Sequence, residues 1–181
     1  MIKLLASSYR KAQAATVSAL LLMASVVLSG VSFAPPFGKW TRLSSDPIVS
    51  PKGDKFESAG TFNPSVVKKD GKFVMLYRAQ DHNGTSSLGY ATSDDGIHFT
   101  SRADPVMVSE APYEKGGGVE DPRLQKIGDT YYLTYTGYNN VDGATADKKD
   151  AQLCLATSVD LIHWQRKGVI IPSFKGKWNV K

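Results

Sequence analysis

Short runs rich in apolar, aromatic and β-branched residues recur along this chain after residue 34, and no long helical periodicity accompanies them. Alternation of apolar and polar positions is clear in KFVMLYR at 72–78, and it is weaker in YYLTY at 131–135, which indicates burial on both faces. Runs of this length and composition are typical of strands. The pattern therefore predicts an all-β chain.

The strand pattern occurs twice. Asn63-Pro64 precedes one apolar run, and Asp121-Pro122 precedes a similar run 58 residues later. A second block, LGYATS at 88–93 followed by IHF, returns as LCLATS at 153–158 followed by IHW. A repeat of about 60 residues built from short strands is typical of a β-propeller blade. The sequence therefore predicts two blades.

The turn signals divide each predicted blade into four strands. Asp70-Gly71 and Asp95-Gly96 are the hairpin signals of the first blade, and the loop at 138–150 separates two strands of the second. The strands are expected near residues 63–69, 72–80, 86–93 and 97–102, and near 119–126, 130–137, 151–158 and 162–170.

The first 34 residues have the composition of a targeting segment. A basic start precedes an apolar, uncharged stretch at 14–29, and Ser32 and Ala34 are placed as in a cleavage site. This pattern predicts a secretory signal peptide. Pro35 would follow the cut and hinder it, so an N-terminal membrane anchor through residues 14–33 is the alternative, although it is short for a full span. Both interpretations predict an exported protein, which is periplasmic, extracellular or membrane-anchored.

The rest of the chain divides into a lead-in and a repeat region. Residues 35–60 are rich in Pro, Gly, Ser and charge, and one strand is expected in WTRL at 40–43. Residues 61–181 are expected to hold blades 1 and 2 and, from Trp178 onward, the start of a third blade. We therefore expect an incomplete propeller, that is, a truncated catalytic domain.

Charge and cysteine content narrow the function classes. The net charge is +5, but residues 1–34 contribute three basic residues and no acid, so the body is nearly neutral and gives no argument for nucleic-acid binding. No cluster of His and Cys suggests a metal site, and no cofactor is expected. The single cysteine, Cys154, lies in an apolar run and is interpreted as a buried structural thiol.

The first strand of each blade lines the central channel of a propeller, so the two copies of that strand are where a site is expected. Positions that differ in chemistry between the copies are the candidates, namely Asn63 against Asp121 and Arg78 against Thr136. Positions that are identical are interpreted as scaffold: Pro64 with Pro122, and His98 with His163.

Asp121 is the strongest candidate. The glycines at 116–118 let backbone and ligand approach closely, and Pro122 stiffens the turn. Carboxylates that flank a sugar are the groups that break glycosidic bonds. On a regular strand Arg123 would share the side of Asp121 and favour the ionised carboxylate, whereas a general acid must hold a proton. From spacing alone, a structural Asp–Arg pair is an equally good interpretation.

At FNP (62–64), LYRA (76–79), GVEDPR (118–123) and LATS (155–158) the chain resembles glycoside hydrolase family 130 over about residues 56–181. These are β-mannoside phosphorylases and β-mannosidases built as five-bladed propellers. The resemblance implies that Asp121 is the catalytic acid and that it delivers its proton through a hydroxyl of the bound mannose. It also implies a substrate-binding set, which comprises Asn63, Arg78, Asp81, Glu120 and Arg123.

Position 152 bears on the reaction. Phosphorylases of the family usually carry an arginine just before the L-x-LATS strand (153–158 here), where it holds phosphate. This chain has Gln152, a neutral amide without the charge for that contact. Lys181 matches another phosphate contact of the family. The resemblance thus favours inverting hydrolysis of a β-mannoside oligosaccharide or mannose-containing glycan, and expected export, away from cytoplasmic phosphate, points the same way.

Three other functions stay open. The first is a β-mannoside phosphorylase, which transfers mannose to inorganic phosphate as co-substrate and gives mannose 1-phosphate. The others are a non-catalytic sugar-binding propeller and a furanosidase or arabinanase-type propeller with similar blades. The oligomeric state is not indicated by the sequence.

Overall fold

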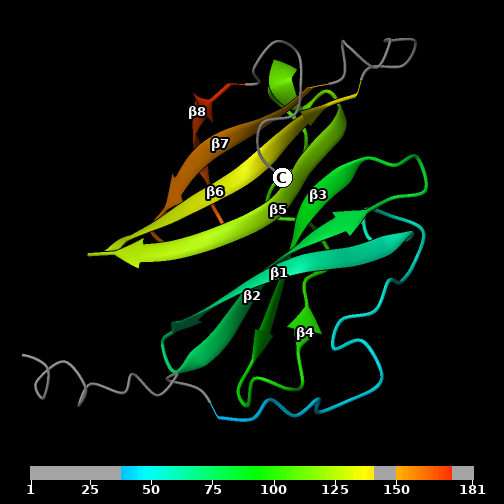
Figure 1. The fold of residues 1–181 in the computed structure, drawn as a ribbon, viewed down its shortest axis with the longest axis vertical. Helices are drawn as coiled ribbons and strands as arrows, with labels where there is room; N and C mark the ends of the chain where they lie inside the picture. The colour runs from blue at the N-terminus through cyan, green and yellow to red at the C-terminus, as the bar shows by residue number, and fades with distance from the viewer. Residues whose placement is uncertain (1–37, 141–149, 173–181) are drawn as a thin grey trace, which may run out of the picture. The chain divides into compact units, whose positions relative to one another are not determined.

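The computed structural model describes residues 38–140 and 150–172 (Figure 1). The chain comprises two compact units, Met1–Leu43 and Ser44–Lys181, and the described strands all lie in the second. The predicted signal or anchor segment, Lys181 and most of the loop at 138–150 lie outside the described residues. Among the residues that are described, no helix is long and apolar enough to span a membrane.

The regular elements in the described part of the second unit are strands and one short 3-10 helix, so the all-β prediction is confirmed. The elements are β1 (Gly60–Lys69), β2 (Lys72–Gln80), β3 (Ser86–Ser93), β4 (Thr100–Ser101), η1 (Pro112–Glu114), β5 (Gly116–Ile127), β6 (Thr130–Asn139), β7 (Asp150–Ser158) and β8 (Gln165–Ile171). Neighbours pair antiparallel within β1–β4 and within β5–β8. The two blades join through one parallel bridge, Ser86 with Gly118, and the sheet is not closed.

The predicted Asp70-Gly71 turn is confirmed. It joins β1 to β2, and the two residues have φ values of 51° and 80°. A two-residue turn with both central residues at positive φ matches the right-handed twist of the flanking strands. Asp70-Gly71 can adopt this shape because glycine has no Cβ and aspartate tolerates the left-handed region.

The fourth strands are shorter than predicted, since β4 begins only at Thr100 and β8 only at Gln165. The cause is an aspartate turn before each strand. Asp95 Oδ1 accepts hydrogen bonds from the backbone N–H groups of Ile97 and His98, both at 2.8 Å, and Asp160 repeats the arrangement in the second blade. Backbone groups engaged by a side chain in this way cannot join a sheet ladder.

The histidines of these turns are structural, as predicted. His98 Nδ1 lies 2.6 Å from Asp95 Oδ2, and His163 Nδ1 lies 2.6 Å from Asp160 Oδ2. The hydrogen bond to His98 is the largest cause of a lowered pKa at Asp95. At Asp160 burial raises the pKa, but the hydrogen bonds, led by that from His163, outweigh it and lower the pKa overall.

The strand predicted at 40–43 is wrong. Residues 38–43 have no strand geometry, and Trp40 and Leu43 are 81% and 76% exposed. A strand needs a neighbour to complete its ladder, and pairing begins only at Gly60, opposite Gln80. The sequence around Trp40 has suitable strand residues, but propensity does not decide the structure without a partner strand.

The later lead-in covers one face of blade 1. Val49 and Phe56 pack against the buried cluster of Met75, Tyr77, Ala79 and Ala91. Residues 74–77 of β2 are consequently all buried, whereas 131–135 of β6 alternates between buried and half-buried positions. The prediction of burial on both faces therefore fails for 131–135 and holds instead for the strand with the clearer alternation.

One apolar cluster spans both blades. Its buried members are Leu76, Leu88, Met107, Val119, Leu133, Tyr135, Cys154 and Ala156. Cys154 is fully buried, and burial raises the pKa of its thiol to about 11. A thiol that stays protonated is a poor nucleophile, so the structural interpretation of Cys154 is confirmed.

Each blade also contains a buried carboxylate that the sequence analysis missed. Tyr77 donates its hydroxyl to Glu57 Oε2 at 2.6 Å, and Tyr135, at the equivalent position, donates to Glu114 Oε1 at 2.8 Å. The carboxylate lies just before the first strand of its blade in both cases. These hydrogen bonds fix the entrance to β1 and to β5.

Glu114 is fully buried and has several donors. Arg166 contributes Nε at 3.0 Å and Nη2 at 3.2 Å, and the backbone N–H groups of Glu110 and Ala111 lie at 2.9 and 3.0 Å from Oε2. Burial raises the pKa of Glu114, but these hydrogen bonds outweigh it and hold the pKa below its ordinary value of 4.5.

We predict that Glu114→Gln destabilises the full-length protein by about 3 kcal/mol at neutral pH, because it leaves the charge of Arg166 poorly compensated. Since the native pKa of Glu114 is lowered, this stabilisation is complete above the unfolded value and is lost as the pH falls through the native pKa. Urea unfolding at about pH 7 and about pH 3 checks the difference between wild type and variant.

Glu110→Gln is the matched control. Glu110 binds the same arginine, at 2.7 Å from Nη1, but its side chain is 64% exposed, so we expect a loss below about 1 kcal/mol. If the difference in unfolding free energy between wild type and Glu114→Gln stayed constant or grew on acidification, the lowered pKa of Glu114 would be contradicted.

Candidate functional site

The first strands of the two blades, β1 and β5, are the channel strands of the sequence analysis, and they meet at the strongest candidate residues. Asn63 of β1 donates from Nδ2 to Asp121 Oδ1 of β5, at 2.6 Å. The two residues occupy equivalent positions of the repeat, and each precedes a proline. The structure thus brings the first pair of chemically different repeat positions into direct contact.

Asn63 and Asp121 share an unusual backbone. Their φ values are 45° and 51°, and the ladders shift register between Phe62 and Ser65 and between Glu120 and Arg123. Left-handed geometry at a residue other than glycine costs on the order of 1–3 kcal/mol and is concentrated at functional sites. Asn and Asp tolerate it best, and the following proline lacks the N–H that a regular ladder would use.

The bulge at Asp121 changes the expected partner of its carboxylate. Arg123 is exposed and donates from Nη1 to the carbonyl of Pro122 at 2.8 Å. The ion pair of Asp121 is with Arg78, whose Nη1 lies 3.7 Å from Oδ1. The predicted Asp121–Arg123 pair is therefore wrong, because it assumed the regular alternation that the register shift removes.

Arg78 of β2 is the centre of the site. Its Nη2 lies 2.7 Å from Glu120 Oε1, its Nε donates to Ser86 Oγ at 3.0 Å, and its guanidinium lies 5.4 Å from the ring centre of Phe62. The Arg78 side chain is 17% exposed. Arg78 thus has a fixed orientation and presents one edge to Asp121.

Glu120 lies behind this guanidinium and is 1% exposed, whereas the neighbouring Asp121 side chain is 12% exposed. Ser86 Oγ lies 3.3 Å from Glu120 Oε1. Tyr138 of β6 belongs to the same surroundings. Burial raises the pKa of Tyr138, and the charge of Glu120 adds to this whereas that of Arg78 opposes it. In this arrangement Arg78 contacts both carboxylates, and Asp121 is the more exposed of the two.

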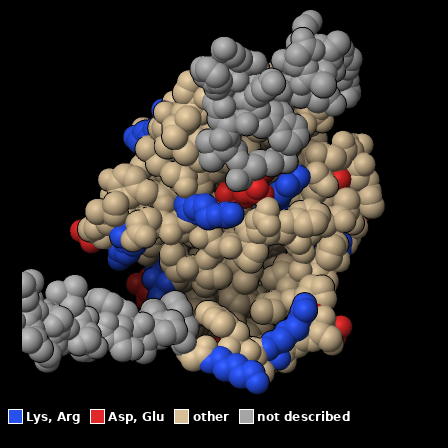
Figure 2. All heavy atoms as spheres, in the orientation of Figure 1, with Lys and Arg blue, Asp and Glu red and all other residues tan. Residues whose placement is uncertain are grey.

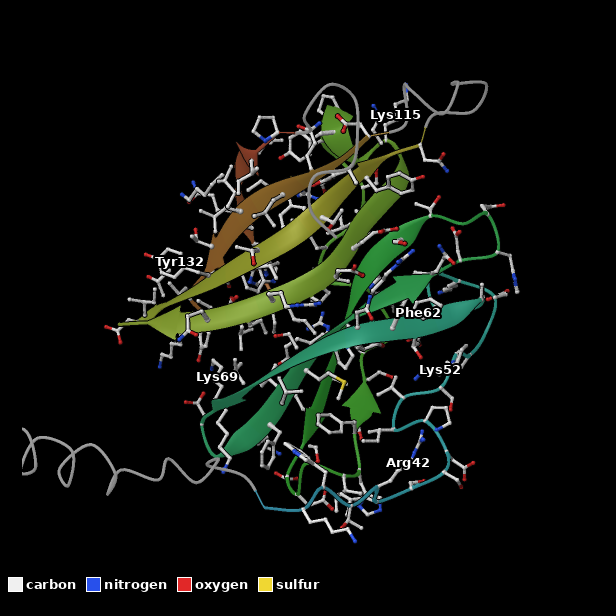
Figure 3. All side chains as sticks on the ribbon, in the orientation of Figure 1. Arg42, Lys52, Phe62, Lys69, Lys115 and Tyr132 are labelled. Atoms are coloured by element: carbon white, nitrogen blue, oxygen red, sulfur yellow. The ribbon has the colours of Figure 1, made fainter. Side chains whose placement is uncertain are left out.

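Phe62 is a site residue that the sequence analysis did not select. It is 42% exposed, lies on β1 (Figure 3) and packs its ring on the Arg78 guanidinium. Its position directly before Asn63 could have identified it from the sequence. Its repeat equivalent is Glu120, so it also meets the rule that equivalent positions of different chemistry are candidates.

The contacts described for two further predicted residues, Asp81 and Gln152, are with groups other than Arg78 and Asp121. Asp81 Oδ1 accepts hydrogen bonds from the backbone N–H groups of Asn83 and Thr85, both at 2.9 Å, so it shapes the β2–β3 turn. Gln152 of β7 donates from Nε2 to Asp150 Oδ2 at 2.7 Å. Binding roles for Asp81, Glu120 and Arg123, and for Lys181 outside the described residues, stay predictions.

The glycines before Asp121 are required by the backbone. A Cβ on Gly118 would lie 2.0 Å from the carbonyl oxygen of Ser86, and one on Gly117 would lie 2.6 Å from that of Tyr138. Gly118 also has a φ of 93°. The close approach that the sequence analysis assigned to backbone and ligand is, in the structure, the approach of β5 to β3 and β6.

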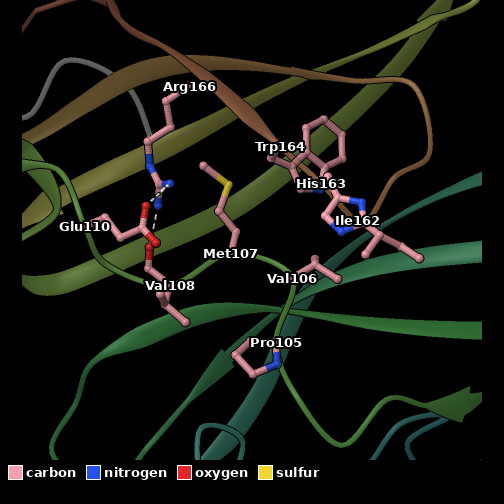
Figure 4. Close-up of a pocket in the computed structure, with 9 residues that line it drawn as sticks. All are labelled: Pro105, Val106, Met107, Val108, Glu110, Ile162, His163, Trp164 and Arg166. Atoms are coloured by element: carbon pink, nitrogen blue, oxygen red, sulfur yellow. Dashed lines mark hydrogen bonds and ion pairs between the residues drawn. The ribbon is translucent and has the colours of Figure 1, made fainter.

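A pocket of about 350 Å³ lies elsewhere, between the linker before η1 and the start of β8 (Figure 4). Met107, Trp164 and the ion pair of Glu110 with Arg166 line it, and no predicted site residue does.

Basic side chains are scattered over the face drawn in Figure 2. Within residues 38–140 and 150–172, no group of three His, Cys, Asp or Glu is placed to hold a metal ion.

The described strands form two consecutive four-stranded blades of the β-propeller class, with an Asp–Arg–Glu cluster that joins β2 of the first blade to β5 of the second. The model of glycoside hydrolase family 130, described as β-1,4-mannooligosaccharide phosphorylase, matches residues 41–181. The chain belongs to this family. The family's structures are five-bladed propellers, and the described strands form two such blades.

Two curated relatives come from Thermoanaerobacter sp. (strain X514). A 1,2-β-oligomannan phosphorylase is 40% identical over 74% of this chain, and a β-1,2-mannobiose phosphorylase is 37% identical over 72%. The chain spans 46% of the length of each relative.

A solved structure also matches, with a TM-score of 0.67 and 34% identity over 81% of this chain and 45% of that one. It is described as showing that the GH130 family of mannoside phosphorylases contains glycoside hydrolases that target β-1,2 mannosidic linkages in Candida mannan.

We predict that Gly118→Ala lowers the free energy of unfolding of the full-length protein by about 4 kcal/mol, because the methyl group meets the backbone of Ser86 at a positive φ. Gly128→Ala is the control. It has a φ of 59° and nothing within 4 Å of its Cβ, so it should cost about 1 kcal/mol. Denaturant unfolding measures both, and equal losses would contradict the close contact.

Proposed function

We propose that the protein cleaves β-mannosides, with Asp121 as the general acid. The observation that carries the proposal is the placement of this carboxylate on a channel strand, at a backbone outlier, between Asn63 and Arg78. Membership of family 130 supports the same reaction class. The proposed substrate class is taken from the two phosphorylases at 37–40% identity and the solved structure at 34% identity, whose descriptions name mannosides or mannan.

The described contacts of Asp121 distinguish its two carboxylate oxygens. The described contacts of Asp121, from Asn63 Nδ2 and Arg78 Nη1, both fall on Oδ1. These donors stabilise negative charge on Oδ1, so we propose that Oδ2 is the oxygen from which Asp121 donates a proton. In inverting cleavage the acid protonates the departing glycosidic oxygen while a nucleophile attacks from the opposite face of the sugar. Here the proton passes from Oδ2 to the glycosidic oxygen through a mannose hydroxyl.

We further propose that the attacking nucleophile is water. Gln152 stands where phosphorylases of the family usually have arginine, and its amide donates to the carboxylate of Asp150 at 2.7 Å. Phosphate binding relies on charge-assisted hydrogen bonds, usually from arginine or lysine. A neutral amide bonded to a carboxylate gives no such contact, and the adjacent negative charge repels phosphate.

Phosphorolysis is the second candidate. Both curated relatives at 37–40% identity are described as phosphorylases, and in that case inorganic phosphate replaces water and mannose 1-phosphate is the product. A requirement for phosphate separates the two reactions. Export is a separate proposal that rests on residues 1–34, and recovery of the protein from the exported fraction of its host cells would support it.

We predict that Asp121→Asn in the full-length protein lowers kcat on a β-mannoside about 10³-fold, because the amide cannot give up the proton. The substitution preserves size, so KM should change little. Asp129→Asn, on the exposed β5–β6 turn, is the matched control and should keep wild-type kcat. Initial rates on β-mannobiose measure both, and wild-type turnover by Asp121→Asn would remove the acid role.

A further inference from the structure

Glu120 is the most buried charged group around Asp121. Its side chain is 1% exposed, and it is adjacent to Asp121 in the chain. Burying a carboxylate is costly unless it is paired, and its partner is Arg78 Nη2 at 2.7 Å. A side chain so buried presents little surface to solvent, and Arg78 links it to Asp121.

The guanidinium of Arg78 is shared unequally between two carboxylates. It lies 2.7 Å from Glu120 Oε1 and 3.7 Å from Asp121 Oδ1. The charge of Arg78 is therefore compensated first by Glu120. Without Glu120, the full charge would act on Asp121, and a neighbouring cation favours the ionised form of a carboxyl group. An ionised Asp121 has no proton to give.

The internal repeat relates two of the residues that contact Arg78. Glu120 and Phe62 occupy equivalent positions, and both contact Arg78, one as an ion pair and the other through its ring. Phe62 also lies opposite Arg78 in the β1–β2 ladder, and Glu120 lies opposite Thr136 in the β5–β6 ladder. Two blades thus hold one guanidinium from two directions.

We propose that Glu120 is a positioning residue that compensates the charge of Arg78 and so keeps Asp121 able to hold its proton. The proposal rests on the proposed function, in which Asp121 is the general acid. The groups described in contact with this carboxyl are Arg78 from β2 and the neutral amide of Asn63 from β1, and Glu120 from β5 and Tyr138 from β6 lie around Arg78. Of these, Arg78 and Glu120 carry charge at neutral pH.

The test is a pH titration of the Asp121 carboxyl, followed by NMR of ¹³C-labelled aspartate in the full-length protein. Asp121→Asn identifies the resonance. We expect Glu120→Gln to move the midpoint of this titration to lower pH by about 1 unit. Adding Arg78→Gln to that variant should move the midpoint back up, because the uncompensated cation is then removed.

The matched control is Glu57→Gln. Glu57 is also buried, at 3% exposure, but it binds Tyr77, whose side chain faces away from that of Arg78 on β2. It should not change the titration of Asp121. If Glu120→Gln does not fold, Glu120→Asp retains a carboxylate withdrawn by one methylene and should shift the midpoint in the same direction by less.

A midpoint that is the same in wild type, Glu120→Gln and Glu120→Asp would overturn the proposal, as would an equal shift in Glu57→Gln. The titration needs no turnover. A protein inactive on mannosides would therefore refute the proposed function, and the titration would still decide the role of Glu120. In an active enzyme, the alkaline limb of the kcat/KM profile should move to lower pH in Glu120→Gln, and an unmoved limb would count against the proposal.

Discussion

The site depends on one shared charge, the guanidinium of Arg78. This side chain leaves β2 in blade 1 and binds Glu120 while it contacts Asp121, both on β5 in blade 2. The contact is possible because Gly118 lets β5 approach the backbone of Ser86, where the two blades join. The catalytic candidate is therefore assembled between blades, and the precision of its carboxylate follows from how closely the blades pack.

The repeat is what made most of the fold predictable from the sequence. Turn signals such as Asp70-Gly71 act locally, so β1, β2, β3 and β6 lie close to their predicted ranges. The late starts of β4 and β8 were missed because Asp95 and Asp160 engage backbone groups that alternation alone assigns to strands. The WTRL prediction failed because strand formation depends on a partner that propensity cannot supply.

The sequence predicted which residues lie at the site, but it did not predict which of them contact one another. Comparing the repeats selected Asn63, Asp121 and Arg78, and the structure joins all three. The partner of Asp121 was wrong because bulges at both channel strands abolish the two-residue period on which the Arg123 argument rested. Glu57 and Glu114 were missed because a carboxylate before a strand looks like ordinary surface until the tyrosine that binds it is located.

The central claim is that this site cleaves β-mannosides by hydrolysis, and the most direct measurement identifies the products. The full-length protein would be incubated with β-1,2- and β-1,4-mannobiose, with and without inorganic phosphate. The account predicts free mannose as the product in both conditions, consistent with a neutral Gln152 at the phosphate position. Mannose 1-phosphate formed only when phosphate is present would contradict the choice of water, and no cleavage of either disaccharide would contradict the claim itself.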